Sequence, residues 1–234
     1  MQLGLNIEVM MTANLAKVIE ISDDSVHQGD VLGIDKTIFR DSIQSGIYQF
    51  KSVSKFHPIT AGGSRAWEEI VAAFRETVIS ENNGWKAVHE HGMPLLINPS
   101  KQLTIVITSG DINTGLNNGI QPKTRNQKGT ATQDLVNSNY ALFEDVDGID
   151  ILPSSADSHQ TWVFLYTIDK TKSEVRYEMS LPTETSLSGA KGKVKISSWQ
   201  ERIIFEPLPF DDIQSHTLAP TFTDDSDFFD PVKK

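Results

Sequence analysis

The chain has 234 residues, a formal net charge of −10 and no cysteine. This length allows one domain with a sizeable core but falls short of two full domains. The lack of cysteine excludes disulfides, thiolate metal sites and a cysteine nucleophile, and the acidic balance disfavours nucleic-acid binding over the whole surface. Because there is no apolar run of membrane-spanning length and no visible secretory leader, we expect a cytoplasmic protein with no membrane segment.

The first sixty residues carry the weakest patterns. Val18 and Ile19 indicate a short helix or strand, and the short apolar groups between Val31 and Ile59 favour short strands with polar connections. We therefore expect a single α+β domain over 1–205, in which 1–60 either belongs to the core or forms a loosely attached N-terminal subdomain.

A core-packing helix is predicted from Ser64, which follows the glycine pair Gly62-Gly63 and can cap the first turn. Asn82-Asn83-Gly84 supplies the left-handed stop. Apolar residues recur between these signals at helical spacing, as one stripe: Trp67, Ile70, Val71, Phe74 and Val78.

Residues 103–108 are dense in β-branched side chains, which predicts a strand buried on both faces in the middle of a sheet. The loop over 109–129 is long for a compact domain, which is typical of a functional or mobile segment. A second helix is expected from Thr130, since Thr130 and Gln133 match a capping box and Val136, Tyr140 and Phe143 follow at helical spacing.

Alternation with a period of two predicts a β-hairpin over 162–181, with a turn at 169–173. Its first strand is apolar on both faces, whereas Arg176, Glu178 and Ser180 predict one wet face on the second strand. A further strand or pair is expected within 193–205. The order of elements predicts an α+β fold with a mixed or mainly antiparallel sheet, at least two packed helices on one side, and a flexible acidic C-terminal tail.

The junction between the long loop and the second helix is the most suggestive place for a binding site. The first-turn amides of a helix have no internal partners, and the helix dipole adds positive potential there. Cations, a glycine and hydroxyls converge in the sequence at this point and predict a phosphate or carboxylate site, although the spacing of a P-loop is absent. The same residues are also typical of a solubilising, mobile loop that ends in an ordinary helix cap. The residues assigned to this anion site are Lys123, Arg125, Lys128, Gly129, Thr130 and Thr132.

Two histidines, His89 and His91, stand two residues apart and would share one face of an extended segment. Together with Asp111, which follows the buried strand, or with His57, they define a candidate divalent-metal site. Two histidines before a glycine and a proline are also typical of a polar loop, and Asp111 lies in a run that suits a tight turn. A serine hydrolase is poorly supported, because no nucleophile elbow is present.

The segment 206–234 changes character. Between Glu206 and Asp230 there are seven acidic residues and no Lys or Arg, interrupted by prolines. We interpret it as an acidic, Pro-containing tail that solvates the terminus, docks on a partner protein or folds back over a basic patch of its own chain. The tail residues assigned to a partner are Asp225, Asp227, Phe228 and Phe229.

These patterns leave three functions open. The first is a non-catalytic soluble binding or adaptor protein whose anion site takes a phosphate-bearing ligand or a nucleic-acid backbone. The second is a metal-dependent phosphodiester hydrolase, which alone would need a divalent metal. The third is a structural or assembly protein; the oligomeric state is not determined by the sequence.

Overall fold

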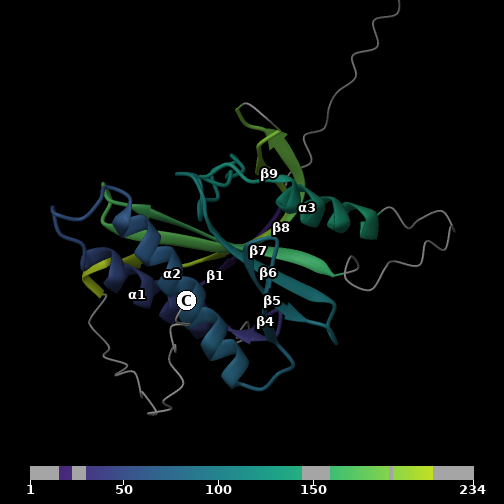
Figure 1. Cartoon of the computed structure of the whole chain (residues 1–234), viewed down its shortest axis with the longest axis horizontal. Coiled ribbons are helices and arrows are strands. Elements are labelled where there is room, and N and C mark those ends of the chain that lie inside the picture. Colours follow the sequence, from purple (N-terminus) through teal and green to yellow (C-terminus); the bar gives the residue numbers. More distant parts are fainter. Residues whose placement is uncertain (1–15, 23–29, 144–158, 190–191, 213–234) are drawn as a thin grey trace, which may run out of the picture.

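The computed structural model describes residues 16–22, 30–143, 159–189 and 192–212. One mixed sheet runs through the molecule with helices on both of its faces (Figure 1). Its strands lie in the order β1-β9-β8-β7-β6-β5-β4, with β10 paired to the start of β8. The strands of this sheet are β1 (Lys17–Ile21), β4 (Lys86–Glu90), β5 (Met93–Asn98), β6 (Leu103–Ser109), β7 (Gln160–Asp169), β8 (Glu174–Leu187), β9 (Val194–Phe205) and β10 (Leu208–Pro209).

The remaining elements are two short paired strands and four helical segments. They are β2 (Asp30–Val31), β3 (Ile34–Asp35), α1 (Lys36–Lys51), α2 (Ala61–Ser80), α3 (Thr130–Phe143) and the 3-10 helix η1 (Phe210–Asp212). In the main sheet β6 and β7 are parallel, as are β1 and β9, and the other neighbours are antiparallel. The predicted α+β class with a mixed sheet is confirmed. None of the helices in the described ranges is long and apolar enough to cross a membrane.

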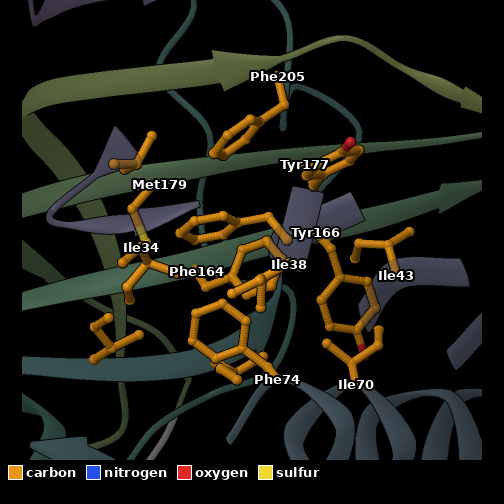
Figure 2. Packing of buried hydrophobic residues seen from close by; sticks show 14 of the residues in the cluster. Ile34, Ile38, Ile43, Ile70, Phe74, Phe164, Tyr166, Tyr177, Met179 and Phe205 are labelled. Carbon is orange, nitrogen blue, oxygen red and sulfur yellow. The ribbon is translucent and has the colours of Figure 1, made fainter. Parts of the chain in front are cut away.

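The main core lies between α1, α2 and one face of the sheet. Figure 2 shows its centre, where isoleucines of α1 and the Phe74 ring of α2 lie among aromatic rings from the strands. The Phe39 and Phe74 rings of the helices have centroids 5.0 Å apart, and each lies 5.2 Å from the ring of Phe164 on β7. Phe205 of β9 stacks on Phe39 at 4.9 Å. These ring contacts fix the positions of α1 and α2 on the sheet.

The segment read as short strands between residues 31 and 59 is largely a helix, so that prediction was wrong. Asp35 caps α1 by accepting hydrogen bonds from the amide and hydroxyl of Thr37. The apolar groups that suggested strands recur at helical spacing, and Phe39, Ile43 and Ile47 are fully buried. With β1 in the sheet and α1 in the core, the described part of residues 1–60 shares the core of the remaining chain.

The predicted helix after the glycine pair is present but begins at Ala61 rather than at Ser64. Gly62 therefore lies within the helix, where a Cβ would stand 3.0 Å from the ring of Phe50 on α1. The glycine permits this close approach of the two helices. The predicted stop is confirmed: the helix ends at Ser80, and Asn82 and Gly84 have positive φ angles of 55° and 81°.

The other face of the sheet carries α3, so the expectation that the helices lie on one side was wrong (Figure 1). The described helix α3 packs through Val136 on Val163 and Leu165, which alternate along β7 with the residues of the main core. It also accounts for the parallel pair β6–β7, since two parallel strands need a long connection between them.

The predicted hairpin is confirmed as β7 and β8, but the wet face of its second strand was wrong. Arg176, Glu178 and Ser180 are at most 1% exposed. The predicted tail also begins later than expected, because β10 pairs with β8 and the Phe210 ring packs against the core. Asp225, Asp227, Phe228 and Phe229 lie outside the described residues, as do the side chains of Tyr140 and Phe143.

Candidate functional site

The loop between β6 and α3 is held to the sheet by backbone hydrogen bonds along its length. Its segment 123–125 runs antiparallel to the end of β6: the Asp111 amide donates to the Lys123 carbonyl, and the Arg125 amide donates to the Ser109 carbonyl. Further along, the Lys128 and Val194 backbones exchange both of their hydrogen bonds. Backbone hydrogen bonds thus connect β6, β7, β8 and β9 in sequence and then join β9 to the loop, which itself bonds to β6. The loop is therefore an ordered part of the fold.

Buried charged side chains under this loop hold it in place. The Arg202 guanidinium of β9 pairs with the Glu178 carboxylate of β8, with Nη2 2.5 Å from Oε2, and both side chains are at most 3% exposed. Glu178 also accepts the Gly115 amide at 2.7 Å. Arg176 donates to the Thr114 and Ile112 carbonyls. These charges therefore replace water as partners for the loop backbone.

Lys128 stands out among the cations of the predicted anion site. Its Nζ lies 2.6 Å from Thr108 Oγ1 on the α3 side of the sheet, and the side chain is only partly exposed. Partial burial lowers the pKa of the Lys128 ammonium below its ordinary value of 10.5. Across the described part of the chain, no carboxylate pairs with it. An ammonium drawn from water without a counter-ion is a candidate for binding an anion.

Lys123 and Arg125 do not join Lys128. Both are exposed, and Arg125 pairs through its backbone with Ser109, which lies on the α1–α2 side of the sheet beside Tyr166. The charge of Arg125 acts on Tyr166: burial raises the pKa of this hydroxyl and Arg125 opposes part of the rise. The structure therefore separates the three predicted cations onto two faces.

The start of α3 retains part of the predicted arrangement. Thr130 is the first helical residue rather than the residue before it, so Gly129 precedes the helix and no capping side chain is available. A Cβ placed at Gly129 would meet no atom within 4 Å, which leaves this approach open. Neither the Thr130 nor the Ala131 amide has an acceptor within the residues described. The buried Thr132 hydroxyl points elsewhere, 3.6 Å from Met93 Sδ.

A pocket of about 120 Å³ opens between α3 and the strands β4, β5, β6 and β7, next to the start of the helix. Its apolar lining includes Met93, Leu95, Ala131 and Leu135. Its polar lining includes Glu90, His91, Thr104, Asp134, His159 and Thr161. The pocket combines an apolar floor with a few convergent polar groups, which is the usual composition of a small-molecule site.

One group in this pocket has an unmet hydrogen-bonding requirement. Thr161 is 2% exposed, and its Oγ1 is buried with no hydrogen-bond partner. Close by in the lining, Thr104 Oγ1 lies 3.3 Å from Nδ1 of His159. Buried hydroxyl groups are normally paired, because an unpaired one costs about 1–3 kcal/mol. Because Thr161 lines the pocket, a rotation of its side chain would present this hydroxyl to a bound molecule.

The predicted metal ligands do not form a metal site. His89 belongs to β4 and pairs with Pro94, whereas His91 and Gly92, at φ 49° and 77°, form the two-residue turn of the β4–β5 hairpin. They therefore do not share one extended segment as expected. Asp111 accepts the Asn113 amide in a tight turn, and His57 Nδ1 accepts the Ser54 amide. Throughout the described ranges, no three His, Asp or Glu side chains are grouped to hold a metal ion.

Sequence reasoning missed most of the residues that build this region. Thr104 belongs to β6 and Thr161 to β7, and His159 directly precedes β7. The three lie together only because β6 and β7 are parallel neighbours. The sequence carries only a weak indication of the buried ion pair between Glu178 and Arg202. Around Glu178, charged residues alternate with apolar ones, which predicted a strand with one solvated face. The same alternation occurs on any half-exposed strand, so it could not identify them.

The chain matches no protein-family model, no curated protein and no solved structure. The function proposed for it below depends on the geometry of the α3 side of the sheet alone.

Proposed function

We propose that the protein is a cytoplasmic, non-catalytic binding protein that holds a phosphate- or carboxylate-bearing small ligand at the start of α3. The Lys128 ammonium and the free amides of Thr130 and Ala131 would contact the anion. The observation that carries this proposal is the partly buried Lys128, which has a hydroxyl partner and, among the described residues, no carboxylate partner.

Partial burial of the Lys128 ammonium has a cost in free energy. Removing an ammonium from water destabilises the folded protein unless an opposite charge compensates it. A bound anion would supply that charge, and the helix dipole and unpaired first-turn amides of α3 would add to its binding. Thr108 fixes the ammonium on the same side of the sheet as the helix. The open space at Gly129 gives a ligand access to the amides.

A small ligand is favoured over a nucleic-acid backbone. Binding along a phosphate chain requires several cations on one surface, whereas Lys123 and Arg125 are separated here from Lys128. Among the described residues, no specific contact favours a metal-dependent hydrolase or an assembly role.

Titration calorimetry with inorganic phosphate tests the proposal, using the full chain and the variant Lys128→Met. The variant keeps the length of the side chain but lacks its charge, and we expect at least a tenfold weaker affinity. Lys123→Met is the matched control, because it removes a cation from the same loop on the other side. Absence of phosphate binding by the wild-type chain, or equal loss in both variants, would contradict the proposed site.

A further inference from the structure

The anion site and the pocket beneath α3 meet at the same residues. Ala131 supplies one of the free first-turn amides and also lines the pocket. Met93 lines the pocket too and contacts the Thr132 hydroxyl. Leu95 pairs with Val106, and continuing this register by two residues sets Met93 level with Thr108, the partner of Lys128. A ligand whose anion binds at the start of α3 therefore extends naturally into the pocket.

The pocket and the anion site carry opposite electrostatic character. Two carboxylates, Glu90 and Asp134, line the pocket, and no Lys or Arg is among its lining residues. Two imidazoles, His91 and His159, add nitrogen acceptors when they are neutral. Such a lining suits a hydrogen-bond donor with a positive charge and disfavours a second anion.

We infer that the ligand is zwitterionic: a short chain with a phosphate or carboxylate at one end and a primary ammonium at the other. This inference rests on the proposed anion site and adds the identity of the second group. The ammonium binds in the pocket, where the carboxylates of Glu90 and Asp134 balance its charge. The unpartnered Thr161 hydroxyl accepts one of its hydrogens once the Thr161 side chain rotates towards the pocket. The chain between the two ends packs on Met93 and Leu95.

The size of the pocket limits the length of the chain. A volume of about 120 Å³ lies well below the ~300–1,000 Å³ that is usual for pockets of drug-sized ligands. A small space of this kind favours an ammonium on a short chain of methylene groups over a nucleoside or a fully substituted sugar ring. The class of ligand is thus an aminoalkyl phosphate or a small amino acid.

Titration of the full chain with three probes tests the inference: inorganic phosphate, ethyl phosphate and 2-aminoethyl phosphate. Because only the last has an ammonium, we expect it to bind at least tenfold more tightly than ethyl phosphate. The variants Thr161→Val and Asp134→Asn should remove most of this difference while leaving the affinity for inorganic phosphate within twofold. Glu76→Gln, on the exposed surface of α2, is the control and should preserve the difference.

The outcomes separate the two proposals. If ethyl and 2-aminoethyl phosphate bind equally well and Lys128→Met weakens both, the anion site stands and the ammonium site is wrong. If Asp134→Asn and Thr161→Val weaken inorganic phosphate as strongly as 2-aminoethyl phosphate, the pocket has no separate role and the inference also fails. If none of the probes binds, both the anion site and its extension are refuted.

Discussion

The two faces of the sheet are built by different chemistry. On the α1–α2 face, aromatic and aliphatic side chains from helices and strands fill the space, as Phe39, Phe74 and Phe164 illustrate. On the α3 face, much of the buried material is charged or polar, including Glu178 and Arg202. Apolar contact dominates the packing of the first face, whereas buried polar groups on the second are stabilised mainly by hydrogen bonds and ion pairs.

This difference indicates where function is expected. Apolar packing offers a ligand little to recognise beyond shape. The α3 face contains an ammonium without a carboxylate partner within the described residues, two free amides at a helix start and an unpaired hydroxyl at Thr161. Groups left unsatisfied in an otherwise well-paired face are sites where a ligand can gain binding energy.

The largest expected effects on stability compare one buried group from each face. Phe164→Ala should lower the free energy of unfolding by about 3–5 kcal/mol, because it opens a cavity among three rings. Glu178→Gln should lower it by a similar ~3–5 kcal/mol, because it leaves the Arg202 charge buried without its counter-ion. Urea denaturation followed by circular dichroism measures both.

A double variant of the Glu178–Arg202 ion pair tests the contrast between the two faces. Combining Glu178→Met with Arg202→Met should cost much less than the sum of the single changes, since no charge remains unpaired. Glu184→Gln, at an exposed position of the same strand, is the control and should change stability by less than ~0.5 kcal/mol. Additive losses in the double variant would mean that the ion pair is not coupled, and the contrast between the faces would be lost.

A smaller effect is expected where the loop crosses the buried arginines. Gly115 has a φ of 69°, and a Cβ there would lie 2.7 Å from Cβ of Arg176 and 3.1 Å from the Tyr177 amide. Gly115→Ala should therefore cost about 1–3 kcal/mol through backbone strain and contact. Gly119→Ala shares the positive φ but meets no atom, so it should cost less. Equal costs would show that the loop does not rest closely on Arg176.

The smallest effect has the opposite sign. Because burial lowers the pKa of Lys128 in the folded protein, the protonated form destabilises the fold at neutral pH. Without ligand, Lys128→Met should raise the melting temperature slightly, although it removes anion binding. The penalty is complete below the lowered pKa and disappears as the pH rises towards 10.5, so the advantage of the variant should shrink over that alkaline window. A melting temperature that falls at neutral pH would assign Lys128 a structural role.

Several elements were predictable from local sequence because their signals are local. The helix α2 followed from an apolar stripe and its Asn82–Gly84 stop, and the β7–β8 hairpin from its alternation and turn. The helix α1 was missed because its apolar residues come in groups separated by polar ones, which resemble short strands. Its start depends on the Asp35 cap, a signal of a few residues.

By itself, the sequence determined the α+β class, the central strand β6 and the presence of a cationic loop before α3. Only the tertiary structure decided that α3 lies on the face of the sheet opposite α1 and α2. It also decided that Lys128 contacts Thr108 on the α3 side while Arg125 lies near Tyr166 on the other side. Likewise, only the tertiary structure brings Thr161 and His91 into the lining of one pocket. Spacing along a chain fixes the face of a single helix or strand, since it reflects local geometry. The pairing of distant strands and the burial of their charges depend on contacts between residues far apart in the sequence, for which no local pattern exists.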